Sequence, residues 1–400
     1  MLTEREPYYR QPLLHTPFHA RMREFSQVDC FIPWSGYSTV DVFTTVEQEY
    51  FAIRNSASLY DLTPMVKYRI AGPDATRYLD RLMTRHIAKL PVGRVAYGIW
   101  CDDAGKLIDD GTVFRLGESE YRLCTAEHQL DWLLDSSIGF DVHIEEVTAQ
   151  IAALALQGPC SCWVLRAIGL SGIETLAPFE SRSCTLGEMT LLVSRTGFTG
   201  DLGYELWVEP GYAEPLWDRL MAAGRTRLLR PIGSRALNIA RLEAGFLQPN
   251  LDFVSSARTL RNGTARSPFE LALGWLVDLR KGHFTGRRAL LQESLAPPLR
   301  RLAGLDVAGN KPAQNALLYA DRHGRREIGS VTSAAWSPTC KRNIALAMLA
   351  APYFEIGQEV WAEIYLNREL VWERRMVRAR VVERPFFAPQ RRRSTPAGNF

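Results

Sequence analysis

The residues with the clearest potential for chemistry lie in the stretch 193–210. Gly197, Gly200 and Gly203 separate two apolar runs, 190–196 and 204–208, and this pattern predicts the two strands of a hairpin. Glycine permits positive φ and lets a ligand approach the backbone closely. Glu205 begins the return strand, where its carboxylate could accept paired hydrogen bonds from a flat heterocycle that carries N–H groups. A glycine-rich structural hairpin with a solvated Glu205 fits the same spacing, which alone does not decide between the two.

A second candidate is the pair Asp109 and Asp110. Residues 96–101 predict a strand, 102–106 a turn, and the residues from 107 onward a returning strand that contains both aspartates. Aspartate is depleted in strands, and successive strand residues point to opposite faces. One carboxylate should therefore face inward, where it needs a partner or a function. The alternative is a solvated hairpin with surface carboxylates.

The glycine hairpin, Thr-Gly-Phe-Thr-Gly-Asp-Leu-Gly-Tyr-Glu, resembles the folate-contacting hairpin of the aminomethyltransferase family, which includes the glycine-cleavage T-protein. The resemblance spans roughly residues 45–350, with several motifs in the family's order. It rests on Tyr-Asp-Leu-Thr-Pro-Met at 60–65, the aspartate pair, Arg-Leu-Glu-Ala-Gly at 241–245, Ser-Pro-Phe-Glu at 267–270 and Ile-Gly-Ser-Val-Thr-Ser at 328–333. The implied fold class is α+β, a three-domain cloverleaf with a small C-terminal β-barrel and a central folate channel.

The resemblance also implies site residues. Glu205 would hold the pterin ring of tetrahydrofolate, and Asp109, the first of the pair, would be the catalytic carboxylate beside it. We predict that five further side chains contact the folate: Met65, Tyr97, Phe198, Arg235 and Trp275. A core role remains open for Met65, as does a surface role for Arg235 at a helix terminus.

Two departures from the family pattern bear on the substrate. The strand that ends at 124–128, Cys-Thr-Ala-Glu-His, lacks the asparagine found in true aminomethyl carriers, and residues 246–253 replace the family's Tyr-Gly-x-Glu-Met-Asp segment. The altered pocket resembles that of folate-dependent demethylases. These move a methyl group from a small methylated compound (a methyl ether, methylamine or sulfonium) to N5 of tetrahydrofolate. An aminomethyltransferase that acts on a lipoyl carrier protein is one alternative. A non-catalytic folate-binding module is another, against which the retained Asp109 argues.

The pattern of elements predicts five segments. A folate-binding α+β domain combines 1–58 with 145–255, a second α+β domain covers 59–144, and a connecting segment covers 256–298. A β-barrel follows at 299–386, and 387–400 is predicted to be a disordered basic tail. Strand, Gly-Pro and helix occur twice in that order, near 66–83 and 151–165, which indicates two related α+β units.

Composition narrows the function classes. The chain of 400 residues is 46% hydrophobic and 23% charged, with a formal net charge of +4, which does not indicate a nucleic-acid partner. Seven scattered cysteines and seven histidines without ligand spacing predict reduced thiols and no metal. No leader-like or membrane-length apolar run stands out, so we expect a cytoplasmic protein without a membrane partner.

Overall fold

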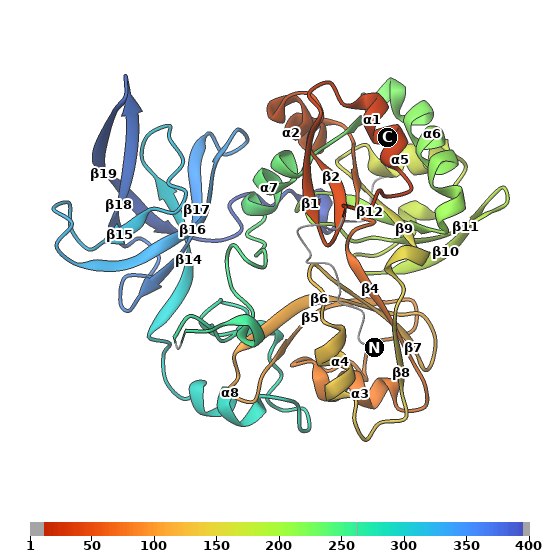
Figure 1. Ribbon diagram of the computed structural model, residues 1–400, viewed down its shortest axis with the longest axis horizontal. Coiled ribbons are helices and arrows are strands. Elements are labelled where there is room, and N and C mark those ends of the chain that lie inside the picture. The colour runs from red at the N-terminus through yellow and green to blue at the C-terminus, as the bar shows by residue number, and fades with distance from the viewer. Residues whose placement is uncertain (1–11, 262, 395–400) are drawn as a thin grey trace.

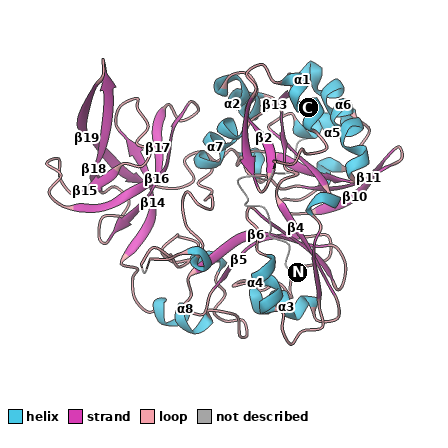
Figure 2. Ribbon diagram, in the orientation of Figure 1, coloured by secondary structure: helices cyan, strands magenta, loops and turns pink. Residues whose placement is uncertain are grey.

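Two α+β domains and a β-barrel surround a common centre in the computed structural model, which describes residues 12–261 and 263–394 (Figure 1). Strands form most of the barrel and the two sheets, and helices pack against both sheets (Figure 2). This arrangement confirms the predicted α+β class with a C-terminal barrel.

The first domain is built on a six-stranded sheet. Its strands lie in the order β10 (Ser181–Leu186), β11 (Met189–Ser194), β12 (Gly203–Val208), β9 (Ala152–Gln157), β3 (Ser58–Asp61) and β13 (Arg230–Pro231). A separate hairpin joins β1 (Cys30–Trp34) to β2 (Tyr37–Val42). The helices of this domain are α1 (His19–Phe25), α2 (Val46–Asn55), α5 (Ser161–Ala167), α6 (Ala213–Gly224) and α7 (Ser234–Glu243).

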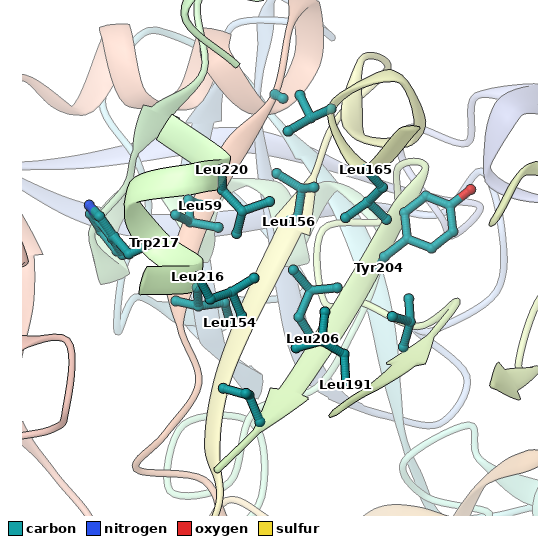
Figure 3. Packing of buried hydrophobic residues seen from close by; sticks show 14 of the residues in the cluster. Leu59, Leu154, Leu156, Leu165, Leu191, Tyr204, Leu206, Leu216, Trp217 and Leu220 are labelled. Atoms are coloured by element: carbon teal, nitrogen blue, oxygen red, sulfur yellow. The ribbon is translucent and has the colours of Figure 1, made fainter. Parts of the chain in front are cut away.

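Alternation along β9 and β12 divides this sheet into a packed face and a site face. Leu154, Leu156 and Leu206 point to one side, where they pack with Leu216 and Trp217 of α6 (Figure 3). Ala153, Ala155 and Trp207 point to the other side. The apolar burial on the outer face fixes the strand register, because a slip of one residue would exchange the two faces. The register therefore also fixes where Glu205 points.

The second domain repeats this architecture with five strands. The order is β5 (Val95–Cys101), β6 (Leu107–Arg115), β7 (Glu120–Thr125), β4 (Val66–Ala71) and β8 (His143–Glu146). Its outer face packs against α3 (Ala75–Leu82) and α4 (Leu130–Ser136). The predicted sequence of strand, Gly-Pro and helix is present as β4 with α3 and as β9 with α5.

The third domain is a closed barrel. Its strands follow the order β14 (Arg300–Val307), β17 (Arg342–Ala350), β16 (Glu327–Ser337), β15 (Leu317–Tyr319), β18 (Glu359–Arg368) and β19 (Val371–Val382). The helix α8 (Arg287–Glu293) lies in the segment that precedes the barrel. Short 3₁₀ helices occupy Thr148–Gln150, Ile173–Thr175, Pro210–Tyr212, Arg225–Arg227, Ser256–Arg258, Gly274–Leu276 and Gln390–Arg392. No helix among the described residues is both long and apolar enough to span a bilayer.

The domain boundaries differ slightly from those predicted. The expected boundary at 58/59 falls inside β3, which pairs with β9 and belongs wholly to the first sheet. The chain crosses to the second sheet only between Asp61 and Val66. It leaves that sheet after Glu146, because β8 pairs with β4.

The prediction of a disordered tail from 387 is wrong for residues 387–394. Arg391 donates hydrogen bonds from Nε and Nη2 to the two carboxylate oxygens of Asp201, at 2.5 and 2.8 Å, and Nη2 also bonds the carbonyl of Arg54. Arg195 bonds the Ser394 carbonyl in turn. Charge-assisted pairs to a buried carboxylate supply the order that the polar sequence did not predict. The rest of the predicted tail, 395–400, lies outside the described residues.

We expect Arg391→Ala to loosen both the tail and the glycine hairpin. The Asp201 side chain is fully buried, and among the described residues Arg54 and the backbone N–H of Leu202 would then bond it without Arg391. The loss should cost about 1–3 kcal/mol of local stability. Hydrogen–deuterium exchange should show faster exchange at residues 197–203 and 389–394. Arg375→Ala, which removes an exposed ion pair of the barrel, is the matched control and should change exchange at neither segment. Unchanged protection in Arg391→Ala would contradict the docking.

Candidate active site

A cavity of about 1470 Å³ lies where the three domains meet. Its walls include β3 and β12 of the first sheet, β5 and β6 of the second, α7, and the barrel strand β14. Six predicted site residues line it together: Met65, Tyr97, Phe198, Glu205, Arg235 and Trp275. Residues separated by more than 200 positions thus share one site.

Glu205 lies on the cavity face of β12 with 8% of its surface exposed. Its Oε2 accepts hydrogen bonds from Thr196 Oγ1 at 2.5 Å and from Ser194 Oγ at 3.5 Å. Burial raises the Glu205 pKa to about 7, and the two hydroxyls only partly oppose that shift. The carboxylate is therefore poised to lose its proton when a ligand brings hydrogen-bond donors to it.

The glycines of the hairpin serve a neighbouring side chain. The amide of Gln157 lies between Gly197 and Gly203, where a Cβ atom on either glycine would approach Gln157 Oε1 to 2.0 or 2.2 Å. Gln157 Nε2 donates to the carbonyls of Thr196 and Tyr204, at 3.2 and 3.3 Å. Gly200 alone of the three has positive φ, at +69°. The close approach that we expected for a ligand is thus made, at these two glycines, by a buried glutamine that joins the two sides of the turn.

The two aspartates face opposite ways as predicted, but the facing expected for Asp109 is wrong, because Asp110 is the one that lines the cavity. Asp110 lines the cavity, and Tyr97 Oη donates to its Oδ2 at 2.6 Å. Asp109 points behind the sheet, 1% exposed, where Gln129 Nε2 donates to its Oδ2 at 2.7 Å. A β-bulge between Trp100 and Cys101 shifts the register, so that Asp110 lies opposite Ile99 and shares the face of Tyr97. Asp109 Oδ1 accepts a hydrogen bond from the backbone N–H of Asp110 at 2.9 Å.

The protonation of the pair follows from this geometry. Burial raises the pKa of Asp110 to about 6, which the hydrogen bond from Tyr97 partly offsets. Burial, and then the charge of Asp110, raises the Asp109 pKa well above its ordinary value. The pKa values of both carboxyls therefore lie above the ordinary value for aspartate.

Aromatic side chains cover the cavity at two places. Tyr97 and Trp275 lie with ring centroids 6.3 Å apart, and Trp275 is 70% exposed. Phe198 stacks on Phe246 with ring centroids 5.5 Å apart. The guanidinium carbon of Arg392 lies over the Phe246 ring, 5.1 Å from its centroid. Flat faces of this kind suit a planar aromatic ligand.

The two departures from the family pattern meet on one wall. Asn250 Nδ2 donates to Glu127 Oε1 at 3.0 Å, and Arg258 Nη1 donates to Glu127 Oε2 at 2.8 Å. Glu127 and Asn250 both line the cavity. Two altered segments more than 120 residues apart in sequence therefore form one polar wall.

Charge is divided along the cavity. Within the described residues, neither Glu205 nor Asp110 has an ion-pair partner at salt-bridge distance. The lining arginines Arg301, Arg384, Arg392 and Arg393 come from the barrel and the tail. Arg235 lines the opposite part, where its Nε bonds Asp41 at 2.6 Å. The cavity thus has an anionic part between the two sheets and a cationic part toward the barrel.

Sequence reasoning missed several lining residues. Trp34 lies in a segment without clear periodicity, and Arg392 lies in the predicted tail. Tyr60 and Phe246 had a signal, because Tyr60 opens the motif at 60–65 and Phe246 opens the departing segment 246–253. Among the described residues, no group of three or more His, Cys, Asp or Glu side chains is placed to hold a metal ion.

Comparisons with known proteins agree with this geometry. Residues 14–281 match the GCVT N-terminal domain, and residues 300–388 match the glycine cleavage T-protein C-terminal barrel domain. The chain belongs to the aminomethyltransferase family. The aminomethyltransferase of Thermotoga maritima is 30% identical over 390 residues, which cover 96% of this chain and 99% of that one. The predicted family is thus confirmed.

A solved structure and a second relative extend the comparison. The glycine cleavage system aminomethyltransferase T of Bartonella henselae superposes with a TM-score of 0.82 at 25% identity, covering 94% of this chain and 98% of that one. A trimethylamine-oxide aldolase of Ruegeria pomeroyi is 32% identical over 360 residues. The match covers 86% of this chain but only 44% of that relative, so this chain spans less than half of its length. Members of this family use tetrahydrofolate as a substrate.

The buried Glu205 gives this family member a testable pH dependence. Its pKa is raised from 4.5 to about 7 in the folded chain, so the folded state holds a proton that the unfolded state releases. The stability of the wild type relative to Glu205→Gln should therefore fall as pH rises from about 4.5 to about 7, by about 3 kcal/mol, and stay constant above.

Urea unfolding of both proteins across this range measures the difference, and other titrating groups cancel between them. A wild type that instead gains stability over Glu205→Gln as pH rises would contradict the burial of an unpaired carboxyl.

Proposed function

We propose that this chain is a tetrahydrofolate-dependent methyltransferase that demethylates a small methylated compound and places the methyl group on N5 of tetrahydrofolate. The observation that carries the proposal is the polar wall of Glu127 and Asn250, which Arg258 supports from outside the cavity lining. Both departures from the carrier-dependent members fall on this wall, where Asn250 donates a hydrogen bond to Glu127. A polar wall supports a small polar donor better than the long arm of a carrier protein.

The division of charge in the cavity suits a folate. Glu205 would accept hydrogen bonds from the N–H groups of the pterin ring, and this contact favours the ionised carboxylate. The stacked rings of Phe198 and Phe246 suit the aromatic middle of the molecule. Arg392 and Arg393 lie toward the cationic part, where the glutamate carboxylates would find partners.

In the proposed reaction, the chain positions two substrates and manages one proton. The lone pair of N5 attacks the methyl carbon, and the bond from that carbon to its heteroatom breaks toward the heteroatom. Because N5 becomes cationic as it is alkylated, the carboxylate of Asp110 stabilises it and accepts its proton. Tyr97 donates a hydrogen bond to that carboxylate, and Asp109 accepts one from the backbone N–H of the same residue. Positioning of this kind supplies much of a two-substrate reaction's rate.

The aminomethyltransferase reaction on a lipoyl carrier is the second candidate, and the names of several relatives favour it. The relative named trimethylamine-oxide aldolase favours a small methylated nitrogen compound instead. A folate-binding module without catalysis is disfavoured by the unpaired Asp110 on the cavity wall, because a binder has no need of a second buried charge.

We expect the chain to bind tetrahydrofolate through Glu205 and to form 5-methyltetrahydrofolate from a methylated donor. Glu205→Ala should cost about 1.5–3 kcal/mol of folate binding, because a charge-assisted contact is lost. Calorimetry measures the binding, and mass spectrometry of reactions with a panel of methylated compounds measures the product. Ammonia release from an aminomethylated lipoyl carrier should be negligible. Robust ammonia release without methyl transfer would favour the second candidate.

The aspartate pair should respond unequally to substitution. Asp110→Asn removes the charge that faces N5 and should slow single-turnover methyl transfer by about 10²–10⁴-fold. Asp109→Asn should slow it by less than about tenfold, because the Asp109 side chain does not reach the cavity. Thermal melts of both variants control for unfolding. If Asp109→Asn is the more damaged variant, the catalytic assignment to Asp110 is wrong.

A further inference from the structure

An aromatic corner closes the anionic part of the cavity. Trp34, at the end of β1, and Tyr60 of β3 both line it, with ring centroids 6.2 Å apart and planes inclined by 33°. Tyr60 is anchored by a hydrogen bond with Ser234 Oγ at 3.2 Å. Trp34 is anchored through Nε1, which donates to the carbonyl of Ala126 at 3.3 Å. Tyr60 is thus anchored to α7 of the first domain, and Trp34 is anchored to the end of β7 in the second domain.

Strand pairing places this corner beside the reacting end of a pterin held by Glu205. Tyr60 pairs with Ala155, and Ala155 pairs with Glu205, so the three lie in one row on the cavity face. Two strand spacings separate Tyr60 from Glu205, which is about 10 Å. A pterin anchored at Glu205 would span most of that distance.

The same corner lies next to Asp110. Gly111 pairs with Thr125, so Asp110 lies beside the end of β7, which continues into Ala126. Trp34 binds the carbonyl of Ala126, and this contact joins the aromatic corner to the aspartate. Arg235 follows Ser234 on α7 and lines the cavity, but its positive charge is neutralised by an ion pair with Asp41. The corner therefore combines two aromatic faces with a carboxylate that forms no ion pair among the described residues.

We propose that this corner binds the donor and that the donor is a methylated onium cation, a quaternary ammonium or a sulfonium. The proposal rests on the proposed function and chooses among its three donor classes. Aromatic faces and a carboxylate attract such a cation, whose positive charge is spread over its methyl groups. A neutral methyl ether gains neither interaction.

The chemistry of departure agrees with an onium donor. N5 attacks one methyl group, the C–N⁺ or C–S⁺ bond breaks, and its electron pair returns to the heteroatom. The product leaves as a neutral tertiary amine or sulfide, so it needs no proton. An ether oxygen would leave as an anion and need an acid, whereas Asp110, the carboxyl beside the corner, is ionised at neutral pH and accepts the proton released from N5, and Glu205 is engaged by the pterin.

The test compares charged and neutral ligands of one shape. Choline and trimethylsulfonium are the cationic probes, and the neutral probe is the alcohol in which a tert-butyl group replaces the trimethylammonium group of choline. Calorimetry on the full chain should give a choline Kd at least about tenfold below that of the alcohol. Trp34→Leu and Asp110→Asn should each bring the two constants close together, and Trp34→Phe should keep part of the preference.

Trp372→Leu is the matched control, because Trp372 is 65% exposed on the barrel hairpin and should leave the preference unchanged. Equal constants for choline and the alcohol in the wild type, or no binding of either cation, would overturn the proposal. Folate binding, measured in the same proteins, separates the two ideas. If the protein binds tetrahydrofolate but does not prefer choline to the alcohol, the onium donor is refuted and the proposed function stands. If it prefers choline but does not bind tetrahydrofolate, the proposed function is refuted.

Discussion

Two buried carboxylates that have no cationic partner among the described residues set the conditions for the rest of this site. Glu205 and Asp110 lie on facing walls of one cavity, and each is held by hydroxyl groups instead of ammonium or guanidinium groups. Burying a charge without a partner is costly, and the raised pKa values of both side chains record that cost. A fold that keeps such groups gains from them only when a ligand supplies the missing donors or positive charge.

Much of the surrounding structure maintains that arrangement. Gln157 joins the two sides of the glycine hairpin, and Asp201 at its turn is held by Arg391 from the tail. Behind the second sheet, Gln129 fixes Asp109, which in turn fixes the backbone of Asp110. The carboxylates are thus supported by polar contacts from outside the cavity, while the cavity side of each remains available to a ligand.

The fold could be predicted largely because it depends on local patterns. Strand alternation, Gly-Pro helix starts and turn residues each recur at the right spacing, so β4, α3, β9 and α5 were located from sequence. The facing of Asp109 and Asp110 was not predicted, because a single bulge beside Cys101 changes the register and leaves no mark in the alternation of residues. The docked tail escaped prediction for another reason. Its order depends on Asp201, a partner 190 positions away.

The site residues can likewise be separated into those that the sequence could place and those that it could not. Residues that belong to a motif, such as Glu205 and Tyr97, could be placed from the family resemblance. The contact between Trp34 and Tyr60 could not, although Tyr60 opens the motif at 60–65, because it depends on how the β1 hairpin lies against the end of β7, which only tertiary structure decides.

A crystal structure of this chain with a reduced folate bound tests the central claim most directly. The account predicts that the pterin N–H groups lie within hydrogen-bond distance of Glu205, about 3 Å, and that N5 faces the carboxylate of Asp110 and not that of Asp109. A pterin bound elsewhere in the cavity, or one whose N5 points away from Asp110, would contradict it.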